Sequence, residues 1–341
     1  MPTYDALLVV SFGGPEGPDD VMPFLENVLR GRPISEERKQ QVAEHYLHFG
    51  GRSPINDQCR ALLLALEAEL EAHGPRLPVY WGNRNWAPLL ASTLKKMADD
   101  GVKRALAFMT SAYSSYSGCR QYRENVEAAR AAVGERAPQV DKLRVFYNHP
   151  GFVEPMARNV GEALARIPAG RREHAALAFT AHSIPSTMAA GCDYEAQLRE
   201  TARLVAEAAG RTDGRLVFQS RSGAPGQPWL EPDILDHLAA IKAEGATDVV
   251  VAPIGFISDH MEVVYDLDTE AAARARDLGL NLVRAATVGT APEFVAMIRE
   301  LIVERMVGGE RRSLGSRGPN HDVCPEDCCL APTARPAGAR P

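Results

Sequence analysis

The chain has 341 residues, of which 45% are hydrophobic and 24% charged, a composition typical of a globular protein with room for two domains. Its formal net charge of −6, with no basic stripe, argues against nucleic acid as a partner. The longest apolar runs, at residues 61–66 and 249–253, are far too short to cross a bilayer, so no transmembrane segment is expected. Residues 1–10 lack the basic region and cleavage site of a signal peptide, and we therefore expect a cytoplasmic protein.

Short apolar or β-branched runs recur along the chain, and helical patterns separate most of them. Each run is nearly continuous instead of alternating, which is typical of parallel strands buried on both faces. The sequence therefore predicts an α/β protein with doubly wound sheets. The expected strands are residues 6–10, 79–81, 105–109, 143–147, 176–180, 216–219, 249–253 and 282–285.

A weak internal repeat indicates two equivalent halves. Residues 95–101 and 240–245 each form a helical pattern that ends in a glycine suited to a helix C-cap, just before the third and seventh expected strands. The division is expected at the helix that begins at Pro150. This gives domains of residues 1–149 and 150–308, with four strands in each.

Residues able to do chemistry follow two of the expected strands. Ligands of open α/β sheets bind beyond the carboxyl ends of the strands. His182 follows the fifth strand, and the segment Ser-Asp-His-Met-Glu, which ends at Glu262, follows the seventh. A single histidine at a strand end is often only structural, so its neighbours must decide its role.

Three carboxylates continue from this second segment. Glu262, Asp266 and Glu270 are spaced four residues apart, which stacks them along one face of a helix. Like charges at this spacing destabilise a helix by a few tenths of a kcal/mol per pair. Two interpretations stay open at this point, a solvated acidic face and a hydrated track of oxygen ligands that leads a divalent cation to Glu262.

Four segments resemble those of ferrochelatases. Residues 178–185 (Ala-Phe-Thr-Ala-His-Ser-Ile-Pro) and 253–262 (Pro-Ile-Gly-Phe-Ile-Ser-Asp-His-Met-Glu) are similar to the two signature segments of that family, and residues 7–15 and 50–55 also agree with it, in the same order. The resemblance implies two Rossmann-like domains of the chelatase type, each with a four-stranded parallel sheet, and a porphyrin cleft between them. It also implies a lyase of haem biosynthesis that inserts Fe²⁺ into a porphyrin.

The residue types suit this reaction. Metallation removes two pyrrole protons and replaces the water shell of Fe²⁺ with four ring nitrogens. His182 is expected to be catalytic, since a neutral imidazole can accept a proton or ligate iron. Glu262, also expected to be catalytic, would guide the metal or take the second proton from the opposite side of the ring, with Asp266 and Glu270 behind it as further metal ligands. The side from which iron arrives is left open.

Similarity to the family also suggests groups that hold the propionates of the porphyrin, and arginine is their natural bidentate partner. Two departures from the family pattern limit how far the site can be copied. Phe12 stands where many bacterial relatives carry a tyrosine that can ligate iron, and residues 84–86, Arg-Asn-Trp, differ from the Arg-Tyr of protoporphyrin enzymes. The candidate propionate contacts are Arg30, His45, Ser53 and Tyr122.

The lip of the expected cleft, residues 13–24, favours one porphyrin over another. It carries Glu16, Asp19 and Asp20, whereas membrane-associated relatives have a more apolar lip. The polar lip favours the four-carboxylate substrate coproporphyrin III over protoporphyrin IX. Other haem-pathway enzymes are expected as partners that pass the substrate on or receive it.

A tail of residues 309–341 is rich in Gly, Arg and Pro and cannot bury itself unless something pins it. It holds Cys324, Cys328 and Cys329, three thiols within six residues, and a fourth would complete a metal or [2Fe–2S] ligand set. Cys119, in a Gly-containing turn after the third strand, is the best fourth. The resemblance supports a [2Fe–2S] cluster, since ferrochelatases of the actinobacterial type carry one on a C-terminal extension.

Alternatives to this ligand set and to this function remain. Cys59 has the helical spacing of a buried residue, whereas Cys192 lies in a loop and competes with Cys119. Zinc or free thiols could replace the cluster, whose expected role is to staple the tail. One rival function is a cobalt or sirohydrochlorin chelatase. Another is a non-catalytic porphyrin or haem carrier, and the cysteine-containing tail also suggests a redox sensor.

Overall fold

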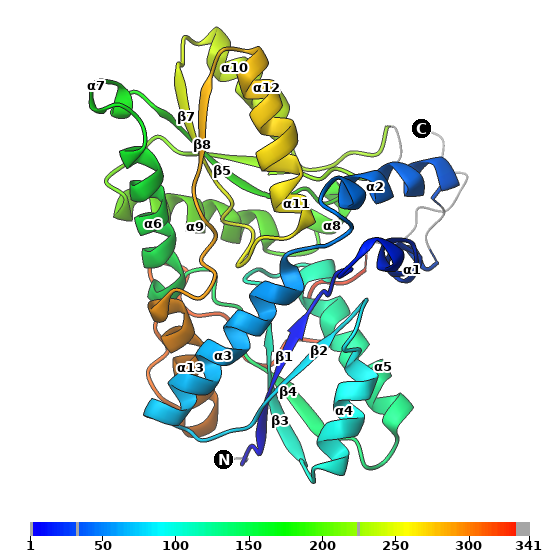
Figure 1. Ribbon diagram of the computed structural model, residues 1–341. Helices are drawn as coiled ribbons and strands as arrows, with labels where there is room; N and C mark the ends of the chain where they lie inside the picture. Colours follow the sequence, from blue (N-terminus) through cyan, green and yellow to red (C-terminus); the bar gives the residue numbers. More distant parts are fainter. Residues whose placement is uncertain (1–2, 32–33, 224–225, 332–341) are drawn as a thin grey trace.

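The computed structural model describes residues 3–31, 34–223 and 226–331. It contains two four-stranded parallel sheets, ordered β2-β1-β3-β4 and β6-β5-β7-β8, and Figure 1 places them at opposite ends of the molecule. The predicted α/β fold with two Rossmann-like domains is confirmed. The strands are β1 (Ala6–Ser11), β2 (Val79–Asn83), β3 (Arg104–Met109), β4 (Gln139–Lys142), β5 (Ala176–His182), β6 (Arg215–Gln219), β7 (Asp248–Ala252) and β8 (Asn281–Arg284).

The central strands of both sheets are buried along their whole length, as the continuous apolar runs predicted. Every residue of β1 and of β7 is buried. One expected strand, residues 143–147, is wrong. The edge strand β4 pairs with β3 through residues 139–142 instead, and the apolar residues after it leave the sheet and pack in the core that the two domains share. Their hydrophobicity reflects this interdomain burial and not strand pairing.

Helices flank both sheets (Figure 1). Those before the midpoint of the chain are α1 (Pro18–Leu29), α2 (Glu36–His48), α3 (Ile55–His73), α4 (Leu90–Asp99), the π-helix η1 (Tyr116–Arg120) and α5 (Gln121–Val133). The later ones are α6 (Pro150–Ala165), α7 (Ala169–Arg172), α8 (Ser186–Ala189), α9 (Tyr194–Ala208), α10 (Ile234–Ala243), α11 (Met261–Val264), the π-helix η2 (Asp266–Ala271), α12 (Ala272–Asp277) and α13 (Pro292–Val307). Within the described ranges, none of the helices has the length and apolar character that a bilayer crossing requires.

One continuous core joins the two domains. It runs from β1 and β3 through α6 and α9 to α13, and it includes Phe108, Phe146 and Phe294. Helix α13 contacts α3 of the first domain and α6 of the second, so the end of the helical chain ties both together. Smaller cores cover the outer faces of the two sheets and the underside of α1 and α2.

The first part of the tail is pinned by buried polar contacts. Arg144, 2% exposed, donates from Nε to Glu304 at 2.8 Å and from Nη2 to the carbonyl of Arg312 at 2.9 Å. Asn148 Nδ2 donates to the carbonyl of Gly318 at 2.9 Å. A polar, aperiodic segment is thus held on the body by main-chain acceptors rather than by an apolar face of its own. Residues 332–341 lie outside the described residues.

Candidate active site

His182 and Glu262 lie at the carboxyl edge of the second sheet. His182 is the last residue of β5, and Glu262 belongs to α11, which follows β7. Because β5 and β7 are adjacent and parallel, both side chains reach the same edge. Nε2 of His182 is 3.5 Å from Oε1 of Glu262. The structure therefore brings together the two residues that the sequence analysis selected as catalytic.

The imidazole of His182 is oriented by its neighbours. Its Nδ1 contacts the carbonyl oxygen of Ser183, and the Tyr194 hydroxyl donates to the His182 carbonyl at 2.9 Å. A carbonyl oxygen only accepts hydrogen bonds, so Nδ1 carries a hydrogen and Nε2 faces Glu262. Nε2 is thus the ring atom at which a proton can be exchanged.

Each member of the pair shifts the pKa of the other. Burial alone would lower the pKa of His182, but the Glu262 carboxylate outweighs burial and raises the pKa of His182 to about 9. Burial alone would raise the pKa of Glu262, but the charge of His182 lowers the pKa of Glu262 to about 2. At neutral pH the two side chains therefore form an ion pair, with the proton on His182.

His182 and Glu262 must act on the same face of a bound ring. A flat ring between them would need a carbon contact of about 3.5 Å on each side, or about 7 Å in total. The 3.5 Å between Nε2 and Oε1 leaves no such gap. The expectation that Glu262 acts from the opposite side is therefore wrong. The cause is local, because Gln219 at the end of β6 donates to the Glu262 carbonyl and holds α11 beside β5.

An acidic track leads from Glu262 to the surface. Asp266 is half-buried at the start of the π-helix η2, and Glu270 is exposed near its end. Burial, with Glu262 and Glu270 nearby, raises the pKa of Asp266 to about 7. A π-helix is often found at functional sites, and its wide turn keeps residues four apart on one face. A half-buried carboxylate with a shifted pKa fits a cation track better than a fully solvated acidic face.

Three residues that the sequence analysis did not assign complete this edge. Ser220, at a left-handed φ of +63°, places its hydroxyl on Asp266, and Gln219 holds Glu262 as described. Gln219 ends β6 and Ser220 follows it, so the strand-exit argument applied there would have found both. His260 caps α11, with Nδ1 accepting from the Glu262 amide at 3.2 Å, and burial lowers the pKa of His260. The spacing of residues in the sequence cannot distinguish a histidine that caps a helix from one that is catalytic.

Among the candidate propionate contacts, His45 lies closest in the fold to the acidic track. It is on α2, and its ring stacks on Tyr265, the residue before Asp266, with 3.7 Å between centroids and 11° between planes. Helix α2 thus meets the start of the π-helix η2 through this pair. Burial lowers the pKa of His45, which favours the neutral ring.

The other three candidates are spread along the first domain. Arg30, at the end of α1, is exposed and donates to Asn27 at 2.7 Å. Ser53 is buried against Gly14, where an added Cβ would lie 2.7 Å from the serine. Tyr122 is buried in α5, with the guanidinium of Arg84 over its ring at 4.3 Å. The structure connects none of these three, through the contacts of the described residues, to His182.

The tail brings its cysteines to Cys119. The neighbouring Cys324 thiol and burial raise the pKa of Cys119, and Cys328 Sγ lies 3.5 Å from Cys329 Sγ. Arg120 fixes this arrangement, since its Nη1 donates to the carbonyls of Glu326 and Cys328 at 2.7 and 3.1 Å. Cys329 has a left-handed φ of +54°, a conformation that non-glycine residues rarely adopt and that is common at functional sites.

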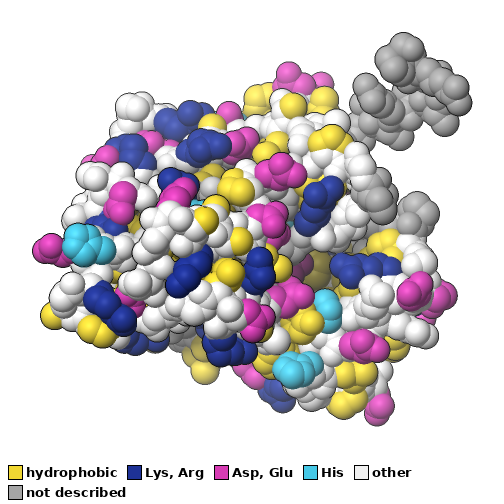
Figure 2. Space-filling model, turned by 90° about the horizontal axis from the view of Figure 1, so that it is seen from above, with side chains coloured by type: hydrophobic (Ala, Val, Ile, Leu, Met, Phe, Trp, Pro, Cys, Tyr) yellow, Lys and Arg dark blue, Asp and Glu magenta, His cyan; other side chains and the backbone are white. Residues whose placement is uncertain are grey.

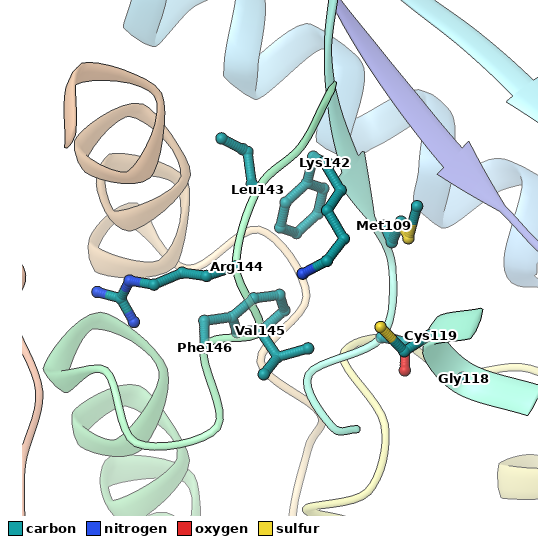
Figure 3. Close-up of a pocket in the computed structure, with 10 residues that line it drawn as sticks. Met109, Gly118, Cys119, Lys142, Leu143, Arg144, Val145 and Phe146 are labelled. Carbon is teal, nitrogen blue, oxygen red and sulfur yellow. The ribbon is translucent and has the colours of Figure 1, made fainter. Parts of the chain in front are cut away.

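The remaining two cysteines have partners elsewhere. Cys59 is buried and donates to Ser11 Oγ at 3.2 Å, and Cys192 donates to the Met188 carbonyl at 3.3 Å. In contrast, the Cys119 sulfur faces a small cavity toward which Lys142 also extends (Figure 3). The neighbouring Cys119 thiol, together with the Lys142 ammonium, lowers the pKa of Cys324 to about 4.

Comparison with known families agrees with this geometry. The family model described as Ferrochelatase matches residues 4–306, which contain both sheets, the His182–Glu262 pair and the acidic track. The chain belongs to the ferrochelatase family. The expected enzyme class, a metal chelatase, is therefore confirmed, as is the resemblance stated from the motifs.

Curated ferrochelatases resemble the chain over nearly its whole length. A protein named ferrochelatase from Rhodopirellula baltica is 57% identical, covering 100% of this chain and 98% of the relative. A coproporphyrin III ferrochelatase from Streptomyces coelicolor is 55% identical, covering 98% of this chain and 96% of the relative. Both alignments extend beyond the family match and into the cysteine-containing tail.

Solved structures support the fold. A sirohydrochlorin chelatase from Bacillus subtilis subspecies spizizenii, crystallised with cobalt, has a TM-score of 0.52 over 89% of this chain and 96% of its own, at 12% identity. A chelatase-like multi-domain protein from Deinococcus radiodurans has a TM-score of 0.52 over 93% of this chain and 57% of its own, at 15% identity. At these identities the likeness is one of fold.

Proposed function

We propose that this ferrochelatase inserts Fe²⁺ into coproporphyrin III and forms coprohaem, as a cytoplasmic enzyme of haem biosynthesis. The observation that carries the proposal is the ion pair of His182 and Glu262 at the inner end of a carboxylate track. A haem carrier has no use for a path that attracts cations. Relatives at 55% identity from two Streptomyces species bear the name coproporphyrin III ferrochelatase, which supports this choice of porphyrin.

The lip residues also favour a substrate with four carboxylates. Glu16 forms an ion pair with Arg60 and accepts from Asn56 at 3.0 Å, while Asp20 accepts from the Glu16 amide at 3.0 Å. Charged side chains of both signs mix on the face seen in Figure 2. A lip that binds water and counter-charges suits a water-soluble porphyrin better than an apolar one that partitions into membranes.

We assign proton uptake and metal guidance to the same face of the porphyrin. Glu270 and Asp266 attract the dication, and Glu262 receives it beside Nε2 of His182. When Glu262 shares its charge with Fe²⁺, it no longer stabilises the proton on His182, and that proton leaves to solvent. His182 then accepts one pyrrole proton, while Asp266, with a pKa of about 7, is suited to carry the second.

The propionates lie toward the lip in this proposal. Arg30 ends α1, the helix that begins in the lip, and His45 lies on the next helix, α2; Arg30 is the exposed cation able to bind a carboxylate bidentately. Ser53 and Tyr122 are assigned the more buried contacts. Phe12 in place of a tyrosine leaves the opposite ring face without an oxygen ligand, so iron delivery is assigned wholly to the Glu262 side.

A [2Fe–2S] cluster is proposed on Cys119, Cys324, Cys328 and Cys329. The donor chemistry fits, since Cys119 neighbours Cys324, Cys328 Sγ lies 3.5 Å from Cys329 Sγ, and Cys59 and Cys192 have their own partners. When bound, the cluster would supply four sulfur–iron bonds that staple the tail to the turn after β3. Chelation itself transfers no electron, so no catalytic step is assigned to it.

We further propose domain limits of residues 1–149 and 150–308, with residues 309–341 as the tail. The start of α6 at Pro150 supports the first limit, and the left-handed Gly308 that ends α13 supports the second. Hand-off of the product to another haem-pathway enzyme is proposed on chemical grounds alone, since free coprohaem is reactive.

Anaerobic turnover tests the substrate. Purified protein is given Fe²⁺ with either coproporphyrin III or protoporphyrin IX, and loss of the free-base absorption is followed. Multiple turnovers with coproporphyrin III, at a higher kcat/KM than with protoporphyrin IX, are expected. A higher kcat/KM with protoporphyrin IX would overturn the choice of porphyrin, and stoichiometric binding without turnover would favour a carrier.

A further inference from the structure

The sulfur cluster site contains a fifth donor that the four-cysteine proposal does not use. His321 lies on the tail, three residues before Cys324, and its ligand atom lies within 4.8 Å of those of Cys324 and Cys328. Nε2 of His321 is 3.8 Å from Cys328 Sγ. An imidazole this close to two thiols is either a ligand or a hydrogen-bond donor to a ligand.

The four cysteines of the proposed cluster leave no ligand position for His321. A [2Fe–2S] cluster takes two protein ligands on each iron. Cys328 and Cys329 form one close pair, with 3.5 Å between their sulfurs, and Cys119 and Cys324 supply the other two ligands of the proposed cluster. The imidazole lies beside both Cys324 and Cys328 and is not needed as a ligand by either iron.

Hydrogen bonds hold His321 in this place. Its amide donates to Asn320 Oδ1 at 2.7 Å, and the Asn320 carbonyl accepts from Arg311 at 2.6 Å. Asn320 Nδ2 also donates to Ser114 Oγ at 3.3 Å, which links the tail to the loop after β3. Arg311 in turn contacts the buried Glu304 at 3.0 Å. An exposed histidine is thus positioned by a chain of contacts that leads into the core.

We propose that His321 donates a hydrogen bond from Nε2 to the sulfur of Cys328 and raises the reduction potential of the cluster without ligating it. This inference rests on the cluster proposed above. Reduction adds negative charge to the iron and sulfur atoms, and a donor directed at a ligand sulfur stabilises that charge. His321 is therefore a positioning and tuning residue for the cluster rather than a catalytic one.

A redox titration of the full chain tests this. The cluster-containing protein and its His321→Ala variant are purified anaerobically, and absorption and electron paramagnetic resonance are recorded at fixed potentials. The variant is expected to keep its cluster content and spectral shape, while its ratio of reduced to oxidised cluster falls about tenfold, or about 59 mV for one electron. His321→Gln, which keeps an N–H donor, should recover part of the shift. His73→Ala, at the exposed end of α3, should show none.

Three results would contradict the inference. An unchanged potential in His321→Ala would exclude the hydrogen bond, and an altered spectrum or lost cluster would make His321 a ligand. Wild-type protein with no [2Fe–2S] spectrum would overturn the cluster and this inference together. Porphyrin turnover is measured separately and would stand in each case, so failure of the inference is distinguishable from failure of the proposed enzyme activity.

Discussion

Nε2 of His182 lies 3.5 Å from Oε1 of Glu262, although the two residues are 80 positions apart in the chain. The pair forms because β5 and β7 are parallel neighbours whose carboxyl ends meet. His182 holds a proton at the place where the proposed reaction must remove protons from the porphyrin. Beside it, the carboxylate of Glu262 can receive a cation.

Replacing Glu262 should change how stability depends on pH. The pKa of His182 is raised from 6.5 to about 9, so its contribution is complete below pH 6.5 and is lost as pH rises through 9. The pKa of Glu262 is lowered from 4.5 to about 2, so its contribution is complete above pH 4.5 and is lost as pH falls through 2. Wild type should therefore exceed Glu262→Gln by about 1 kcal/mol between pH 4.5 and 6.5 in urea unfolding, given the partial exposure of the pair. A difference that stays constant from pH 3 to 10 would contradict the ion pair.

Asp266→Asn should weaken the use of iron. Removing this charge is expected to raise the KM for Fe²⁺ about tenfold, the factor that corresponds to 1.4 kcal/mol, with a smaller effect on kcat. In wild type the KM for Fe²⁺ should rise as pH falls below 7, where Asp266 becomes protonated, and the variant should show less of this rise. Asp268→Asn is the matched control, because Asp268 in the same helix is paired with Arg284 at 2.6 Å. Equal effects of both substitutions would argue against a directed track.

The buried Arg144–Glu304 pair should be essential for stability. Both side chains are at most 5% exposed, and Nε of Arg144 is 2.8 Å from Oε1 of Glu304. Among the described residues, Arg144→Met leaves the buried Glu304 with Arg311 as its one charged partner, which should lower the free energy of unfolding by about 3 kcal/mol. Arg158→Met breaks the exposed pair with Glu293 and should cost less than about 1 kcal/mol. Thermal unfolding of both variants checks the difference, and similar costs would show that burial does not set the value.

Cys119→Ser should remove the cluster, whereas Cys192→Ser should not. Cys119 neighbours the tail cysteine Cys324, which raises the pKa of Cys119, but Cys192 donates to the backbone of its own loop. Iron and inorganic sulfide per chain, measured after anaerobic purification, should fall to near zero in the first variant only, and its tail should be cut faster by a protease. The reverse result would make Cys192 the fourth ligand.

Much of the fold follows from local patterns in the sequence. Continuous apolar runs identified β1 and β7, and the glycines at 101 and 245 end their helices at positive φ as the repeat predicted. The strand predicted at residues 143–147 was wrong because an apolar segment that crosses between two domains has the same sequence pattern as a buried strand. Local hydrophobicity predicts that a segment is buried, but it does not predict which element the segment packs against.

The site was only partly accessible from the sequence. The ends of the strands indicated His182 and Glu262. The distance between the two side chains depends on where Gln219 holds α11, and this distance decides that both act on the same face of the porphyrin. The same limit applies to the tail, since Cys119 and Cys324 are 205 residues apart and no local signal ties them. His321 was missed because it lies outside the cysteine spacing that drew attention to the tail.

The most direct test of the central claim is anaerobic iron insertion into coproporphyrin III by wild type and His182→Ala, with His73→Ala as a control histidine. Loss of the proton acceptor should lower kcat by at least about 100-fold, while porphyrin binding, followed by fluorescence quenching, stays within a few-fold of wild type. Near-normal turnover by His182→Ala would contradict the account, because His182 and its pairing with Glu262 would then have no part in the chemistry.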